Sequence, residues 1–250
     1  YLAMNMNMVA NEAFLDTASV RSSVVSHAKT LGYTPNSVRA PIAFVNVTLN
    51  NVGNLTSATI PVGTVFTTVI DDVNYQFVTV AEHSIQIENG VISFTNLPIY
   101  EGTYVTNRYT FDADNVDQKF YVNDENGDTT TLIVDVFDNS SSTSSTTFTL
   151  ATDTTQTASD SNVYFLQESV DGKFEIYFGD GIIGKALSDG NVVRMRYVVT
   201  NKTKANGASS FSTSATISGI TNITTATVSN ASGGAEKESI QSIKFNAPLD

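Results

Sequence analysis

Cysteine and tryptophan are absent from the 250 residues, and charged side chains are scarce at 15%. Without cysteine the chain has no disulfide, no zinc–thiolate site and no thiol nucleophile, and its redox compartment stays undetermined. Lysine and arginine number 13 against 25 acidic residues, which gives a net charge of -12. This charge repels phosphate and no lysine or arginine run offsets it, so no nucleic acid is expected as a partner. No apolar run approaches the roughly 20 residues of a membrane helix, so no membrane contact is expected either.

The residues that are present favour a β-rich globular protein. With 41% hydrophobic and 10% aromatic residues the chain can bury a core, and its length fits one or two domains. Serine, threonine and asparagine fill many polar positions, which suits strands with hydroxyl-rich outer faces. The chain begins at Tyr1 without an initiator methionine or a signal-peptide pattern, so we expect a part of a longer protein.

Helical periodicity dominates only the first long segment, from about Asn7 to Leu31. It predicts one amphipathic helix, ended by Gly32 and Pro35. Its apolar stripe contains Leu15, Ala18, Val25 and Ala28. The stripe can bury against the chain's own domain or against a partner, and the sequence leaves both open.

From Ala40 onward the hydrophobic period changes to two, which predicts strands almost throughout. Asn89-Gly90 is a strong hairpin signal between two alternating segments. Acidic and glycine-containing turns separate two further pairs of strands in the same way. The expected strands are 42–49, 73–77, 85–87, 92–94, 120–122, 132–137, 163–166, 174–178 and 192–199.

Two changes of composition suggest the domain limits. Residues 139–147 are serine, threonine and asparagine alone, which predicts a loop or linker, and a second shift follows Thr200. Residues 235–245 return to helical character, with acidic residues in the first turn. We therefore expect a helical arm at 1–39, β-rich portions at 40–138 and 139–205, and a linker with the start of a further domain at 206–250. The fold class is mainly β with an N-terminal α-helix, in antiparallel β-sandwich-like domains, with a further α/β unit starting at the C-terminal end.

Catalytic and ligand motifs are weak. His27 and His83 are the only histidines, and neither has an acid and a nucleophile beside it in the sequence, so no catalytic site is predicted. Residues 178–185 have Walker-like glycine and lysine spacing, but Ala186 replaces the required hydroxyl residue. A strand rather than a helix follows, so we interpret the glycines as turn residues, and we expect no cofactor and no small-molecule substrate.

A calcium hypothesis rests on the acidic residues between 112 and 135. Their spacing does not fit an EF-hand, because Val116 and Asp117 occupy the fifth and sixth positions of a loop that starts at Asp112. We interpret the acids as solvated turn residues and predict no metal site. The set comprises Asp112, Asp114, Asp117, Asp124, Asp128 and Asp135.

Several segments and their order along the chain resemble those of the baseplate wedge proteins of contractile-tailed bacteriophages. More narrowly, the chain resembles the large wedge subunit of the baseplate J-like family. The Phe-Gly-Asp-Gly and Gly-Gly-Ala-Glu segments are the most specific of them. The segments are Asn11-Glu-Ala-Phe-Leu-Asp-Thr-Ala18, Leu31-Gly-Tyr-Thr-Pro35, Pro98-Ile-Tyr-Glu-Gly-Thr-Tyr104, Asp128-Thr-Thr-Thr-Leu132, Phe178-Gly-Asp-Gly-Ile-Ile-Gly-Lys185 and Gly233-Gly-Ala-Glu236.

The resemblance implies a structural protein of the virion tail baseplate, assembled in the host cytoplasm, with no catalytic residues to transfer. Its expected partners are a second copy of the chain, other wedge subunits, neighbouring wedges in the ring around the hub, and the hub or sheath initiator. It also implies that the N-terminal helix joins a helical bundle through Phe14, Leu15, Ala18, Val25 and Ala28. The alternative, from the acidic turns and hydroxyl-rich strands, is an extracellular β-sandwich adhesion module stabilised by calcium.

Overall fold

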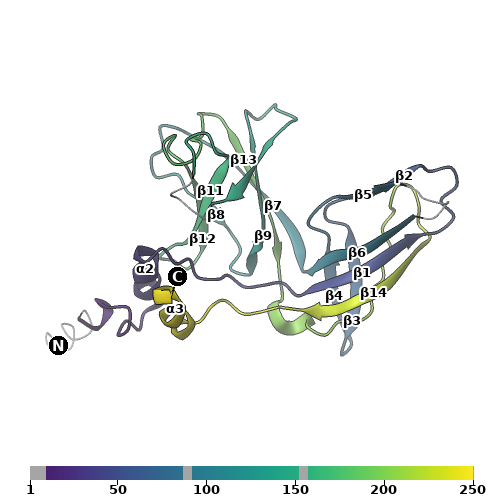
Figure 1. Cartoon of the computed structure of the whole chain (residues 1–250), viewed down its shortest axis with the longest axis horizontal. Coiled ribbons are helices and arrows are strands. Elements are labelled where there is room, and N and C mark those ends of the chain that lie inside the picture. Colours follow the sequence, from purple (N-terminus) through teal and green to yellow (C-terminus); the bar gives the residue numbers. More distant parts are fainter. Residues whose placement is uncertain (1–9, 87–91, 152–156, 250) are drawn as a thin grey trace.

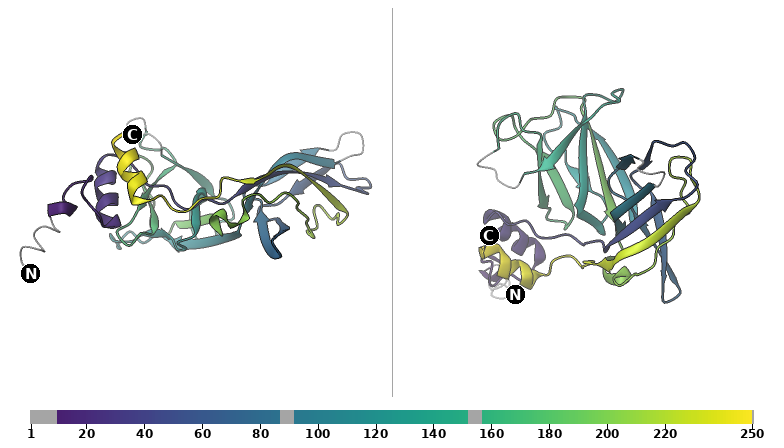
Figure 2. Two further views of the ribbon diagram at one scale, coloured as in Figure 1. Left: turned by 90° about the horizontal axis from the view of Figure 1, so that it is seen from below. Right: turned by 45° about the vertical axis from the view of Figure 1, so that its right-hand side comes forward.

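The computed structural model describes residues 10–86, 92–151 and 157–249. Strands are the predominant regular structure of the described residues, and the strand pairs are antiparallel with one exception, so the mainly β prediction is confirmed. The molecule is elongated, with a pair of helices at one end and a five-stranded sheet at the other (Figures 1 and 2). Within the described ranges no helix is long and apolar enough to cross a membrane.

The five-stranded sheet combines the early part of the chain with a late strand. Along β1 buried and half-buried residues alternate, which places Val45 and Val47 in the core and confirms the predicted strand. Phe66, Phe77 and Ile99 are also fully buried there. In spatial order the strands are β14 (Ile223–Ser232), β1 (Ile42–Leu49), β6 (Ile92–Glu101), β4 (Val73–Val78) and β3 (Val65–Ile70).

A two-stranded sheet lies beside this one and corrects the predicted pairing around Asn89-Gly90. The strand β5 (His83–Gln86) pairs with β2 (Ser57–Ile60), whereas β6 pairs with β1 and β4. The turn itself, 87–91, lies outside the described residues. The local hairpin signal therefore did not identify the strand to which β5 is hydrogen-bonded.

The seven-stranded sheet occupies the middle of the chain. Buried residues from alternate positions of its strands form a second core, to which Val134, Val193 and Met195 contribute. The pair of β10 with β11 is the parallel exception. In spatial order the strands are β7 (Thr103–Thr110), β13 (Val192–Val199), β9 (Gly127–Phe137), β10 (Thr146–Leu150), β11 (Val163–Glu168), β12 (Phe174–Phe178) and β8 (Phe120–Val122).

The two edge strands of this sheet come together, which gives it a barrel-like form. The Tyr109 ring on β7 meets the Phe120 ring on β8 edge-on at 5.6 Å between centroids. The Tyr109 hydroxyl also donates to the backbone oxygen of Tyr121 at 2.9 Å. The contact covers the aromatic core and leaves less of the edges open to other chains.

Pairing in this sheet confirms one predicted hairpin and corrects another. β11 and β12 pair directly around the Asp171-Gly172 turn, as expected. β8 pairs with β12, however, and not with β9, which follows the next acidic turn. Sheet closure requires β8 at the edge, so long-range packing overrides the local signal. The serine and threonine segment is a loop until β10 begins at Thr146.

The chain changes sheet between Glu101 and Thr103, and it returns after Val199. The fully buried Glu101 carboxylate joins both crossings, because it accepts hydrogen bonds from the Thr200 hydroxyl at 2.6 Å and the Asn201 amide nitrogen at 2.8 Å. Gly102 has a φ of 127°, and a Cβ there would lie 2.2 Å from the Val199 oxygen. The change of sheet thus lies well before the boundary expected at 138–139.

The N-terminal segment is not the single helix that the sequence predicts. Residues 10–12 are helical, residues 13–20 form turns and bends, and α2 spans Arg21–Thr30. Glu12 explains the break, since its carboxylate accepts from the Ser19 amide at 2.8 Å, the Ser19 hydroxyl at 2.7 Å and the Val20 amide. The hydrogen bonds from Ser19 lower the pKa of Glu12 to about 2. A polar side chain thereby binds backbone groups that a continuous helix would use.

The C-terminal helix is shorter than the sequence predicts. Ser239 is its N-cap and accepts from the Ser242 amide at 3.2 Å, so α3 spans Ile240–Asn246. Residues before it are extended, and Ala235 pairs with Arg39. Short 3₁₀ turns occupy Lys202–Ala205 (η1) and Ala247–Leu249 (η2). The extended segments lead to α2 and α3, which lie side by side at one end of the molecule (Figure 1).

Candidate functional site

The two helices α2 and α3 pack on each other at one end of the molecule (Figure 1) and form what we call the helical pair, residues 10–34 and 239–249. Its core is small and consists of alanines and β-branched residues. Leu15, Tyr33 and Ile240 are partly buried around it. The fully or almost fully buried members are Ala18, Val24, Val25, Ala28, Ile243 and Ala247.

The structure separates the five residues predicted as an interface. Ala18, Val25 and Ala28 are buried within the chain, Leu15 is partly buried, and Phe14 is 68% exposed. The apolar stripe is therefore occupied largely by α3. Ile240 and Ile243, one helical turn apart, already indicate an apolar face on α3, but no local pattern shows that this face packs on α2.

The helical pair keeps large apolar side chains exposed on its outside. Phe14, Phe245 and Leu249 are 68%, 72% and 73% exposed, and Val20 and Leu31 are 41% and 50% exposed. Exposed apolar residues are common singly, but five on so small a unit are typical of a contact surface.

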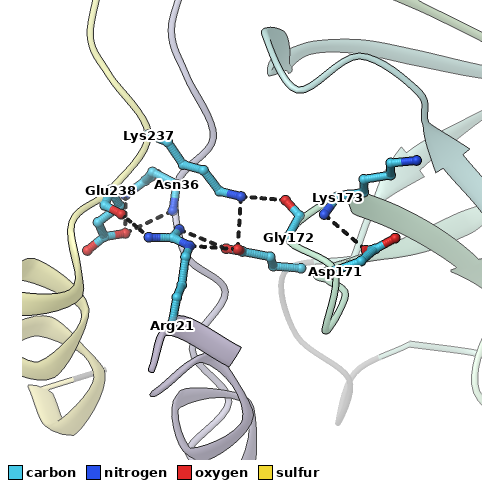
Figure 3. Close-up of polar contacts among 8 residues, drawn as sticks. Arg21, Asn36, Asp171, Gly172, Lys173, Lys237 and Glu238 are labelled. Carbon is cyan, nitrogen blue, oxygen red and sulfur yellow. Dashed lines mark hydrogen bonds and ion pairs between the residues drawn. The ribbon is translucent and has the colours of Figure 1, made fainter. Parts of the chain in front are cut away.

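A buried carboxylate attaches the helical pair to the seven-stranded sheet (Figure 3). Glu168 ends β11, and its side chain is 1% exposed. Arg21 of α2 binds it with two parallel hydrogen bonds, Nε to Oε1 at 2.8 Å and Nη2 to Oε2 at 2.9 Å. Lys237 Nζ approaches Oε1 at 2.8 Å and also donates to the Gly172 oxygen. One carboxylate thus connects α2, the β11–β12 hairpin and the segment that leads into α3.

Glu238 extends the same network toward the helices. Its carboxylate accepts from the Tyr33 hydroxyl and the Asn36 amide, both at 2.8 Å, and from the Ser242 hydroxyl at 2.9 Å. Burial alone would raise the pKa of Glu238, but these hydrogen bonds favour the ionised form and hold it below 4.5. Arg21 Nη1 donates to the Glu238 backbone oxygen, so Arg21 contacts both the Glu168 carboxylate and the main chain of Glu238 (Figure 3). We call Arg21, Glu168, Lys237 and Glu238 the polar joint.

The polar joint suits mechanical attachment. It contains two cations and two carboxylates, all committed to hydrogen bonds or ion pairs. The histidines lie elsewhere: the His27 Nε2 atom is 2.8 Å from the Glu12 backbone oxygen, and His83 begins β5. The arrangement fixes segments that lie far apart in the sequence.

The acidic residues of the calcium hypothesis are dispersed. Asp112 and Asp124 make Asx turns, each accepting from the amide two residues later, as expected for turn acids. In the part of the chain that the structure describes, no group of three or more histidine, aspartate or glutamate residues could hold a metal ion.

Two of these acids correct the prediction of solvated turns, because they are buried. Asp128, 1% exposed, accepts from the Ala40 amide at 2.8 Å and the Thr130 hydroxyl at 2.6 Å. Asp135, 2% exposed, lies between two arginines of β13. Composition alone could not distinguish a turn acid from a buried one, since the partners come from distant strands.

The glycine-rich segment 178–185 is a turn, as interpreted from the sequence. The Asp180 carboxylate accepts from the amides of Ile182 and Ile183 at 2.9 and 3.0 Å. The Gly181 amide donates to the Gly184 oxygen at 3.0 Å, and Gly184 has a φ of 79°. These backbone groups are engaged within the turn rather than aimed at a phosphate.

Comparison with known proteins gives two matches. Residues 104–210 match the family described as "Bacteriophage baseplate wedge protein gp6, third domain". The chain is also 28% identical over 280 residues to "Baseplate wedge protein gp6" of Enterobacteria phage T4, a match that covers 98% of this chain and 40% of that relative. The chain thus spans less than half the length of the curated relative it matches. The family match coincides with the seven-stranded sheet, which begins at Thr103. The chain is therefore similar to bacteriophage baseplate wedge proteins along almost its whole length.

Proposed function

We propose that the chain is a structural subunit of a contractile-tail baseplate wedge, in which the helical pair is a joint to neighbouring subunits. A structural role in the baseplate is supported by the family match and by the relative along almost the whole chain. The finer proposal rests on one observation: the helical pair exposes Phe14, Phe245 and Leu249 while the polar joint fixes it to the seven-stranded sheet. A contact made by these side chains would be transmitted to the sheet.

In this proposal two copies of the chain associate, meet other wedge subunits and neighbouring wedges, and build the ring around the hub. Contacts with the hub or sheath initiator belong to the same hypothesis, as does assembly in the host cytoplasm. The chain acts mechanically and not as an enzyme. A shift of the helical contacts and the ring contacts relative to one another would participate in the switch that triggers sheath contraction.

The five residues predicted from sequence are revised within this proposal. Phe14 stays as a direct contact, and Leu15 lies at the margin. Ala18, Val25 and Ala28 support the contact indirectly, since they hold α2 against α3. A charged residue at Val25 would disrupt the helical pair itself and could not separate folding from assembly.

The test replaces exposed residues only. Phe14→Asp combined with Phe245→Asp is expected to prevent assembly with co-produced wedge subunits, measured as the loss of the complex in native mass spectrometry. The matched control is Val116→Asp combined with Val170→Asp, since these side chains are 91% and 81% exposed outside the helical pair. Both variants are expected to keep the wild-type unfolding midpoint. Normal assembly of the first variant, or equal loss in both, would contradict the proposed joint.

A further inference from the structure

The outer face of the seven-stranded sheet carries a cluster of positive charge that the sequence does not reveal. On β13, Val193 and Met195 are buried in the core, and Arg194 and Arg196 alternate with them. Arg194 lies opposite Arg108 on β7 and opposite Asp135 on β9. Three of the chain's five arginines therefore meet on adjacent strands.

One carboxylate serves two of these arginines. Asp135 Oδ2 accepts from Arg194 Nη2 at 2.9 Å and from Arg196 Nη2 at 2.7 Å, while Oδ1 accepts from the Thr147 hydroxyl at 2.8 Å. The Asp135 side chain is 3% exposed, and those of Arg194 and Arg196 are 24% and 21% exposed. Both oxygens of the Asp135 carboxylate thus accept hydrogen bonds within the chain.

The third arginine adds charge without a counterion. The Arg108 guanidinium lies 5.4 Å from the centroid of the Phe137 ring, and the Arg194 guanidinium lies 4.8 Å from the same centroid. Arg108 is exposed, and among the described residues it makes no ion pair. The cluster thus contains three guanidinium groups and one carboxylate, Asp135, which binds only Arg194 and Arg196, so it carries a net charge of +2 in a chain of net charge -12.

The Tyr104 hydroxyl faces the Arg196 side chain at the edge of the cluster. Burial raises the pKa of Tyr104, and the positive charge of Arg196 and a hydrogen bond with its side chain oppose that rise. Among the described residues, Arg196 Nε and the buried Tyr104 hydroxyl have no other hydrogen-bond partner.

We propose that Arg108, Arg194 and Arg196, the arginine cluster, bind a carboxylate-bearing segment of a partner protein. Guanidinium groups match the planar carboxylate and bind it with two hydrogen bonds. An acidic protein segment suits the site better than nucleic acid, because the net negative charge of the chain repels a long polyanion. A short acidic segment interacts mainly with the charges of the cluster, since salt screens charges beyond roughly 8 Å. This inference does not depend on the helical pair.

The five arginines make the cluster directly observable. In a full chain labelled with ¹⁵N-arginine, each Nε–Hε group gives one resolvable signal by nuclear magnetic resonance. Titration with a blocked hexaglutamate peptide is expected to shift the signals of Arg108, Arg194 and Arg196 in a saturable way. The signals of Arg21 and Arg39 are expected to stay in place. No shift at millimolar peptide, or equal shifts of all five signals, would overturn the proposal.

A charge-matched pair of variants completes the test. Arg108→Gln is expected to weaken peptide binding about three- to fivefold, the effect of one partly exposed ion pair. Arg39→Gln removes the same charge from an exposed position elsewhere and is expected to leave the affinity unchanged. Equal weakening by both variants would indicate a general charge effect and overturn the site. Tighter binding of an oligothymidylate than of the peptide would overturn the protein partner in favour of nucleic acid.

Discussion

Individual acidic residues connect the parts of this molecule, and their roles follow from burial. Glu101 joins the two chain crossings between sheets, Asp128 fixes the segment before β1, and Glu168 attaches the helical pair. Each carboxylate is 5% exposed or less and accepts hydrogen bonds from segments distant in sequence. Ionised groups are costly to bury unless they are paired in this way.

Glu168→Gln tests this at the polar joint. The substitution leaves Arg21 and Lys237 without their shared anion, and we expect the free energy of unfolding to fall by about 3 kcal/mol, at the low end for a broken buried pair because the cations are partly exposed. Urea denaturation measures the change. Glu236→Gln, which removes the exposed partner of Lys202, is the control and should cost about 0.5 kcal/mol. Equal effects of the two variants would show that Glu168 is not a structural connection.

At the scale of elements, the sequence predicted strands better than helices. Alternation identified β1, β4, β11, β12 and β13, because the period of two reflects burial on one face of a strand. The N-terminal helix was predicted too long because Glu12 binds the backbone around Ser19, and helical periodicity carries no information on that contact. Pairings β2–β5 and β8–β12 join strands far apart in sequence, so no local turn could indicate them.

The candidate sites differ in the same way: some lie within one element, and others are built from several. The apolar stripe of Leu15, Ala18, Val25 and Ala28 could be found by periodicity, whereas α3 as its partner could not. Arg194 and Arg196 are neighbours in sequence, but Arg108 joins them only through the register of β7 with β13. Features built from one element were thus accessible from sequence, and features built from several were not.

The attachment of α3 is predicted to weaken in acid. The folded-state pKa of Glu238 lies below its ordinary value of 4.5, so its carboxylate adds stability that is complete above 4.5 and is lost as the pH falls through the folded value. Glu238→Gln cannot ionise. We therefore expect the variant to have faster amide hydrogen exchange in α3 than wild type at neutral pH, with the difference shrinking below 4.5. A difference that is constant with pH would contradict the role of the ionised carboxylate.

At the scale of the whole molecule, the limits of the two large sheets differ from the limits that changes of composition suggest. The seven-stranded sheet uses one continuous segment, Thr103 to Val199, and the family match covers nearly the same residues. The five-stranded sheet needs β14 from after that segment, so it is discontinuous in sequence. Residues 139–145 of the low-complexity segment connect β9 to β10, which pair with each other in the same sheet.

This division predicts which fragment folds alone. Residues 103–200 contain every strand of the closed sheet together with its core, so the fragment is expected to give dispersed amide signals and a cooperative urea transition. Residues 40–138 match the domain expected from composition, but they separate β9 from β13 and β1 from β14. That fragment should therefore be unfolded, because unpaired strand edges and half of each core would be exposed. If 40–138 folded and 103–200 did not, the sheets would not be the folding units of this chain.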